Sequence, residues 1–213
     1  MPLIRAPFHP TFAEFCRAAG LLEAPHLHEE ARELYELGVR RLDPRAGYLR
    51  AAVNSIDELH IEIGGVELEG ECLVSNLSGR GAVYPYVAGC GRGLEEAGGD
   101  DLSRFWIDVL KSLALDAAVD SLKAEVCAEF AVDRCASLNP GSGSGGLWSI
   151  EQQGPLFRLL GSLAEEVGVA LTESVLMIPN KSLSGILFPT SADWTSCTHC
   201  DRASCRMRRL IPN

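Results

Sequence analysis

The sequence lacks a long apolar run. No stretch approaches the ~18 consecutive apolar residues that a membrane-spanning helix requires, so we expect no membrane partner. The first ten residues, MPLIRAPFHP, do not contain the apolar segment of a secretory signal. We therefore expect a cytoplasmic protein, in which cysteine thiols stay reduced.

Positive charge is scarce as well. The chain has 19 Lys and Arg against 29 Asp and Glu, which gives a formal net charge of -10 at pH 7. Nucleic acids attract proteins with a basic surface. The one dense basic cluster is short and consists of Arg202, Arg206, Arg208 and Arg209. The charge balance therefore predicts that no nucleic acid is a partner.

A phosphate-binding motif is also missing. The glycine-rich corner from Gly89 to Gly93 follows an expected strand, but it lacks the lysine and hydroxyl of a P-loop and the spacing GxGxxG. We predict a tight strand-to-helix turn there rather than a nucleotide site.

The composition is that of a globular protein with one large core. The 213 residues are 46% hydrophobic and have a mean hydropathy of +0.07, which excludes a disordered chain and suits a single domain. Residues 1–100 are expected to form helices and then short strands. Residues 101–190 are expected to add a long helix, a glycine loop and a hairpin to the same domain. Residues 191–213 are a cysteine-containing tail.

Local patterns predict the elements of this domain. Thr11 and Glu14 stand at capping-box spacing before a short helix. Apolar residues at helical spacing predict helices over residues 26–42 and 101–132. Between them, the runs YLRAAV, LHIEI, VELEG and ECLV are typical of short strands, with a hairpin turn at Gly64–Gly65.

The segment SLNPGSGSGGLW, residues 137–148, admits two interpretations. Its composition is typical of a flexible linker. However, a helix start follows at once, with Ser149 and Gln152 at capping-box spacing. A short glycine loop held between two helices also suits close backbone approach to a ligand. The residues alone leave both interpretations open.

A second segment carries polar residues within apolar strands. Residues 171–178 and 182–188 predict the two strands of a hairpin around Pro179–Asn180. Glu173 and Ser184 are among the polar residues that interrupt these strands. Such residues line either a solvated face of a sheet or a ligand cleft.

These segments resemble those of a known family. LTESVLMIPNKSLSG, residues 171–185, resembles the LTES-x-x-M-x-P-x-x-S-V-S-G signature of the activation domain of cobalamin-dependent methionine synthase. The upstream NPGSGSG is similar to the PGY-type loop of that domain. PRAGYLRAAV and VAGCG resemble the small stand-alone versions of the domain. The resemblance covers most of the chain and is strongest over residues 113–188.

The resemblance implies an α/β (α+β) fold, with a twisted, mainly antiparallel sheet flanked by helices. In the family, the domain binds S-adenosylmethionine over the corrin, and an electron plus the sulfonium methyl convert inactive cob(II)alamin to methylcobalamin. This chain has no DxHxxG cobalamin-binding motif. The cobalamin must then be carried by a partner, a cobalamin-binding protein or the methionine synthase core, with an electron donor protein. The chain would act as an accessory activator rather than as a complete enzyme, and no residue is expected to be catalytic.

The resemblance also implies a set of residues that bind S-adenosylmethionine. They lie in the long helix, the glycine loop, the hairpin and the segment after it, and they are Glu125, Ser137, Asn139, Gly141, Ser142, Gly143, Glu173, Ser184 and Trp194. The loop departs from the family pattern R-x-x-P-G-Y, because Ser137 and Ser142 stand at the arginine and tyrosine positions. Serine hydroxyls and backbone N–H groups would replace the guanidinium, the strongest partner of a carboxylate.

The eight cysteines fall into two groups. Four of those upstream of the tail are scattered among apolar residues, which predicts buried free thiols at Cys16, Cys72, Cys127 and Cys135. Cys197, Cys200 and Cys205 form C-x2-C-x4-C, a spacing at which thiolates can converge on zinc or an iron–sulfur cluster. Cys90 or His199 would supply a fourth ligand. A dithiol redox role and incidental thiols on an exposed tail remain open.

The identity of the metal at the tail would distinguish between two possible functions. An iron–sulfur cluster at the tail predicts a redox protein that directly reduces the partner corrinoid. Zinc has no redox chemistry and favours the accessory activator.

Overall fold

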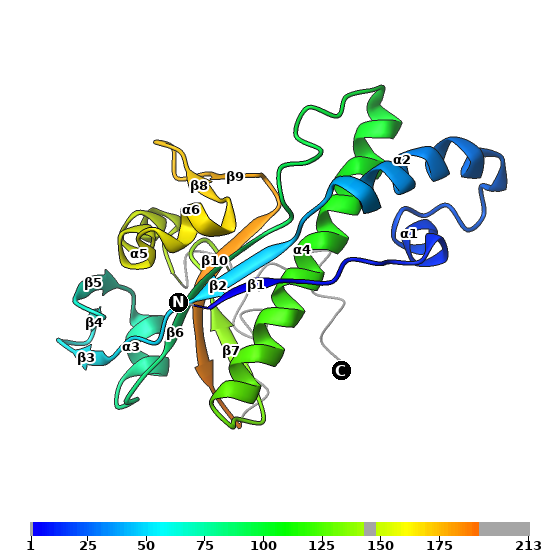
Figure 1. Cartoon of the computed structure of the whole chain (residues 1–213). Coiled ribbons are helices and arrows are strands. Elements are labelled where there is room, and N and C mark those ends of the chain that lie inside the picture. Colours follow the sequence, from blue (N-terminus) through cyan, green and yellow to red (C-terminus); the bar gives the residue numbers. More distant parts are fainter. Residues whose placement is uncertain (1, 143–147, 192–213) are drawn as a thin grey trace.

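The structure is a computed structural model that describes residues 2–142 and 148–191 (Figure 1). Its centre is a five-stranded sheet in which every neighbouring pair of strands is antiparallel. In the order in which they lie side by side, the strands are β1 (Leu3–Arg5), β2 (Arg45–Tyr48), β6 (Tyr84–Gly89), β10 (Ser182–Pro189) and β7 (Cys135–Leu138). This sheet and the helices that flank it confirm the predicted fold class.

Helices cover both faces of the sheet (Figure 1). The long helix α4 (Asp101–Glu129) crosses one face and packs on a cluster that includes Tyr86. Helices α5 (Gln153–Leu160) and α6 (Leu163–Val167) pack on the other face, against a cluster that includes Ile186. Successive side chains of a strand point to opposite faces, which is why the sheet supports two cores. None of the helices in the described ranges is long and apolar enough to cross a membrane.

The amino-terminal helices form a third packed cluster with α4. Helix α1 (Phe12–Ala18) begins with the predicted capping box: the Glu14 N–H donates to the Thr11 hydroxyl oxygen, and the Thr11 N–H donates to the Glu14 carboxylate. The short helix η1 (Pro25–Leu27) and helix α2 (His28–Arg41) follow. Helix α2 packs on the amino-terminal half of α4.

A small sheet lies beside α5. Strands β3 (Val53–Ser55), β4 (His60–Ile63) and β5 (Val66–Glu69) form it, and all of its pairs are antiparallel. The predicted turn joins β4 to β5, and both of its glycines, Gly64 and Gly65, have positive φ angles. The two glycines thus supply the backbone conformation that a tight hairpin turn requires.

The predicted strand over ECLV is wrong. Residues Glu71–Leu77 form helix α3. Leu73 and Leu77 are four residues apart and both are fully buried. Their spacing fits one face of a helix, so packing against the small sheet favours the helix over a strand.

The predicted hairpin over residues 171–178 and 182–188 is wrong in its pairing. Strand β9 (Met177–Ile178) pairs with β8 (Ala170–Leu171), whereas β10 pairs with β6 on one side and β7 on the other. Strand β10 therefore satisfies its backbone groups inside the main sheet. Pro179 also has no N–H to donate to a ladder between β9 and β10.

Candidate functional site

Strand β10 bonds to the backbone of β7 along part of its length and to the side chain of Asn139 beyond it. Among the described strands, β7 pairs only with β10, at residues 186–189. The chain leaves this ladder at Asn139, and the Asn139 Nδ2 donates to the Ser184 carbonyl oxygen at 2.8 Å. A side-chain amide thus continues the edge of the sheet at the point where the backbone pairing ends.

Gly185 makes this contact possible. A Cβ on Gly185 would lie 2.4 Å from the Asn139 Nδ2 and 2.3 Å from the Leu138 carbonyl oxygen. Cβ atoms essentially never come within 3.0 Å of another heavy atom. Only glycine fits at position 185 without a backbone shift, so packing against the loop explains the final glycine of SLSG.

Tyr86 and Ser137 hold the other side of the Asn139 amide. The Nδ2 also donates to the Tyr86 hydroxyl oxygen at 2.6 Å, and the Ser137 hydroxyl donates to the Asn139 Oδ1 at 3.0 Å. Burial raises the pKa of Tyr86 to about 12, although hydrogen bonds with Asn139 and Ser137 oppose the rise. Tyr86 therefore stays neutral at physiological pH, and it positions Asn139 rather than acting as a base.

Ser184 faces the opposite side of the sheet. Its hydroxyl donates to the Gln153 Oε1 at 2.6 Å, and both side chains are almost fully buried. Gln153 is the first residue of α5. The hydroxyl of Ser184 therefore links β10 to α5, while its carbonyl oxygen receives the Asn139 amide.

The glycine loop is closed at its base. The Gly141 N–H donates to the Trp148 carbonyl oxygen at 2.8 Å, and the Ser142 N–H donates to the Asn139 carbonyl oxygen at 3.1 Å. Gly141 has a φ of 78°. These bonds give the loop a defined start at Asn139–Ser142. Gly143 lies outside the described residues.

The two glutamates of the predicted set lie apart from this network. Glu125 is exposed on α4, and Glu173 is exposed in the turn between β8 and β9. Within the described ranges, no hydrogen bond or ion pair joins either of them to Asn139. The structure therefore brings together Ser137, Asn139 and Ser184, but it does not bring Glu125 or Glu173 into contact with them.

The predicted metal site is mostly beyond what the structure describes. Trp194, His199, Cys197, Cys200 and Cys205 all lie outside the described residues. Cys90 is fully buried, and burial raises the pKa of its thiol to about 11. Residues 2–142 and 148–191 contain no group of three or more His, Cys, Asp or Glu side chains that could hold a metal ion.

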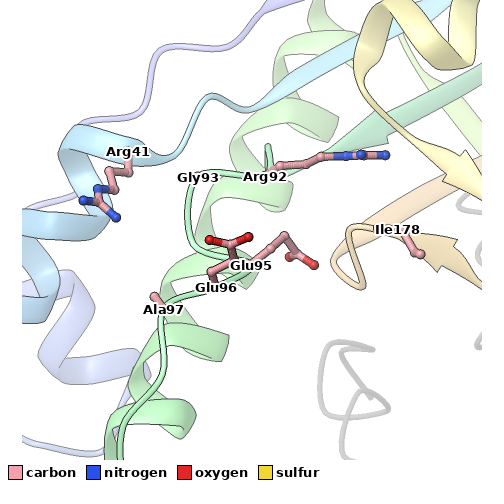
Figure 2. A pocket seen from close by; sticks show the side chains of 7 residues that line it. All are labelled: Arg41, Arg92, Gly93, Glu95, Glu96, Ala97 and Ile178. Carbon is pink, nitrogen blue, oxygen red and sulfur yellow. The ribbon is translucent and has the colours of Figure 1, made fainter.

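A separate hollow lies between the segment after β6 and strand β9. Its volume is about 510 Å³, and its described lining is Arg41, Arg92, Gly93, Glu95, Glu96, Ala97 and Ile178. Figure 2 shows the carboxylates of Glu95 and Glu96 between Arg41 and Ile178. None of the predicted site residues is in this lining. Its charged groups are partly engaged elsewhere, because Glu95 pairs with Lys111 and the Arg92 Nε donates to the Gly168 carbonyl oxygen.

Sequence reasoning missed two members of the network. Tyr86 is 53 residues from Asn139 along the chain, and Gln153 is 31 residues from Ser184, so only the fold brings each pair into contact. A weak signal existed at Gln153, a polar residue at the first turn of an apolar helix. Tyr86 lies in an apolar strand pattern that gives no indication of a hydrogen-bonding role.

Comparisons with known proteins identify the fold. No protein-family model matches the chain, and no curated protein matches its sequence. Among solved structures, the chain is similar to a crystal structure of the MetH reactivation domain bound to AdoHcy, with 15% sequence identity and a TM-score of 0.59. The match covers 92% of this chain and 80% of that chain. The chain therefore has the fold of the MetH reactivation domain, which confirms at the level of the fold the resemblance read from its two motifs.

Proposed function

We propose that this protein is an accessory activator of a corrinoid (vitamin B12) methyltransferase. It would dock on a cobalamin-binding protein or a methionine synthase core and support the reductive methylation of cob(II)alamin. The supporting observation is the fold shared over 92% of the chain with a reactivation domain bound to AdoHcy. AdoHcy differs from S-adenosylmethionine by the sulfonium methyl group, so S-adenosylmethionine is the substrate that this fold suggests.

The reaction requires two inputs that the chain does not contain. A donor protein supplies one electron, S-adenosylmethionine supplies the methyl group, and AdoHcy is released as methylcobalamin forms on the partner. The role of this chain is to hold the methyl donor in position, which lowers the entropic part of the barrier.

The start of the glycine loop offers polar groups for S-adenosylmethionine. The Asn139 amide and the Gly141 N–H are engaged within the protein, so they shape the loop rather than bind. The Ser142 hydroxyl and the backbone after it are the groups we assign to the ligand. Glu173 would balance a positive charge of the ligand. A methionyl carboxylate would meet hydroxyl and N–H groups instead of a guanidinium, so we expect a weaker contact than a bidentate arginine provides.

Calorimetry tests the ligand part of this proposal. S-adenosylmethionine and AdoHcy are titrated into the full chain and into Gly141→Val, with Gly81→Ala as a matched control because a Cβ at Gly81 meets no atom within 4 Å. We expect heat with the wild type and the control and none with Gly141→Val. No heat with the wild type at millimolar ligand would refute S-adenosylmethionine binding.

A reactivation assay tests the docking part. A corrinoid methyltransferase holding cob(II)alamin is mixed with an electron donor, S-adenosylmethionine and this chain, and the visible spectrum follows the formation of methylcobalamin. We expect formation to depend on this chain. An unchanged rate without it would refute the activator function.

The tail supports a second candidate function. C-x2-C-x4-C at residues 197–205 favours an iron–sulfur redox protein that reduces the partner corrinoid directly. Iron and sulfide analysis of anaerobically purified protein tests it, with Cys197→Ser/Cys200→Ser as the comparison. We expect bound iron in the wild type only. Zinc or no metal in the wild type would refute the redox function and leave the accessory activator.

A further inference from the structure

Cys127 and Cys135 face each other at the junction of α4 and β7. The Cys127 thiol donates to the Cys135 sulfur at an S–S distance of 3.7 Å. Both thiols are free, as predicted, but they are only half-buried, which corrects the expectation that they are buried. Of the free cysteines in residues 2–142 and 148–191, these two are the pair in contact.

We propose that Cys127 and Cys135 form a redox modification site, at which a low-molecular-weight disulfide converts the two thiols into a reversible intramolecular disulfide. The inference concerns residues outside the candidate ligand site and does not rest on the proposed function. Its basis is the contact between the two sulfur atoms together with their partial exposure.

The geometry requires little movement. A disulfide bond is about 2.05 Å long, so the sulfur atoms must approach by about 1.7 Å from the observed contact. Cys127 lies in the last turn of α4, and Cys135 is the first residue of β7. Both therefore lie at ends of elements, and a short connection, residues 130–134, joins them.

The chemistry balances with the named oxidant. The thiolate of one cysteine attacks a sulfur of the small disulfide and releases one small thiol, which leaves a mixed disulfide on the protein. The second cysteine then attacks the first cysteine's sulfur and releases the other small thiol. Two protein thiols lose two electrons and two protons in total, and one small disulfide gains them as two small thiols.

Both cysteines are free thiols in the structure. Burial raises the pKa of Cys135 to about 12, and the neighbouring Cys127 adds to the rise, while Lys123 opposes it. Cys135 is therefore protonated at neutral pH, and exchange that needs its thiolate is slow.

The disulfide would anchor the strand that carries the candidate site. Cys135, Ser137 and Asn139 alternate along the chain and so share one side of it. Strand β7 lies at the end of the strand order and pairs with β10 alone among the described strands. A covalent link from Cys135 to α4 would restrict fraying of β7 and slow the exchange of its backbone amides.

Peptide mapping tests the site in the full chain. Reduced protein is incubated with oxidised glutathione, blocked with iodoacetamide and digested with trypsin. Cleavage after Lys123, Arg134 and Arg158 places the two cysteines in separate peptides, 124–134 and 135–158, and each of these contains no other cysteine. We expect a linked pair two hydrogens lighter than the sum of the free peptides, which dithiothreitol removes. Cys72, also half-buried, is the matched control and should not enter a linked pair.

Two further readouts separate this disulfide from reactions of the tail cysteines. Oxidation should raise the Tm by about 5 °C in the wild type and slow hydrogen exchange of residues 136–138, and both effects should vanish in Cys127→Ser/Cys135→Ser. With Cys135→Ser alone, Cys127 should end as a mixed disulfide with glutathione. The proposal is overturned if the two peptides stay unlinked, or each carries glutathione separately, while the tail cysteines oxidise.

Discussion

The Asn139 amide fills the space that a side chain on Gly185 would need. The Nδ2 lies 2.4 Å from the position of a Cβ on Gly185, and it donates to the carbonyl oxygen of the residue before that glycine. The loop residue and the strand residue are thus matched, because the amide reaches the backbone of β10 only where β10 has no side chain.

Gly185→Ala is therefore expected to destabilise the protein. Alanine suits a strand better than glycine, but its Cβ would meet both the Asn139 amide and the Leu138 carbonyl oxygen. We expect a loss of about 2–3 kcal/mol in the free energy of unfolding, measured by urea denaturation, whereas Gly81→Ala should change it by less than about 1 kcal/mol. Adding Asn139→Ala should restore only part of the loss, because the backbone carbonyl remains. Equal free energies of unfolding for Gly185→Ala and Gly81→Ala would refute the steric match.

Asn139→Asp tests the amide hydrogens. An aspartate has no N–H for the Tyr86 hydroxyl or the Ser184 carbonyl oxygen, and its charge would be buried, so we expect a larger loss than for Asn139→Ala, about 3 kcal/mol or more near neutral pH. Protonation removes the charge and supplies one donor. The loss relative to wild type should therefore shrink as the pH falls from about 8 to about 5. A loss that is independent of pH would show that no buried carboxylate forms.

The sequence predicted the elements whose signals are local. The capping box of Thr11 and Glu14, the Gly64–Gly65 turn and the long helix over Asp101–Glu129 each depend on residues within a few positions of one another. Local propensity and periodicity suffice for such features. The overall fold followed from the resemblance of two longer motifs rather than from any single pattern.

The sequence did not predict the features set by distant contacts. Helix α3 replaced an expected strand, and β10 paired with β6 and β7 instead of β9, because packing and sheet pairing decided both. The candidate site shows the same limit. Ser137, Asn139 and Ser184 were predicted, but their roles depend on Tyr86 and Gln153, and only the folded chain brings these near.

Ser184 and Gln153 should be energetically coupled. Each single change, Ser184→Ala or Gln153→Leu, leaves one buried polar group without its partner and should cost about 1–3 kcal/mol. The double variant removes both groups, so its loss should be smaller than the sum by about 1 kcal/mol or more in a double-mutant cycle. Ser162→Ala, which removes an exposed bond to Glu166, is the control and should cost under about 0.5 kcal/mol. Additive losses would show that the Ser184–Gln153 bond contributes little.

His60 should titrate above its usual range. The hydrogen bond to Asp57, at 3.0 Å, is the largest cause that raises the pKa of His60. Desolvation opposes it, and the charges of Asp57, Glu67 and Glu69 add smaller upward contributions. A raised pKa means that the folded state binds the proton more tightly. The resulting stability is complete below the unfolded value of about 6.5 and is lost as the pH rises through the folded pKa.

Proton NMR of the His60 ring tests this titration. Asp57→Asn should lower the midpoint toward the ordinary value, and Glu67→Gln should lower it less. High salt should weaken the effect of Glu67 more than that of the hydrogen-bonded Asp57. A midpoint that does not move in Asp57→Asn would contradict the assigned pair.

The conformation of Gly141 should matter more to the ligand than to the fold. Its φ of 78° favours glycine, tolerates asparagine and disfavours branched residues, and a Cβ there would lie 2.7 Å from the Ile150 Cδ1. Gly141→Val should therefore displace the loop and abolish S-adenosylmethionine binding in calorimetry, while Gly141→Asn should keep part of it. Gly141 is exposed, so we expect the Tm of Gly141→Asn to fall by less than about 3 °C.

The variant Ile150→Ala distinguishes backbone strain at position 141 from a steric clash with the Ile150 side chain. The Ile150 side chain is flexible at its end, so removing it relieves the contact but leaves the positive φ unchanged. If strain dominates, Gly141→Val/Ile150→Ala should bind no better than Gly141→Val alone. Recovery of binding in the double variant would show instead that the collision with Ile150 displaces the loop. Full binding by Gly141→Val itself would remove Gly141, and with it the start of the glycine loop, from the ligand site.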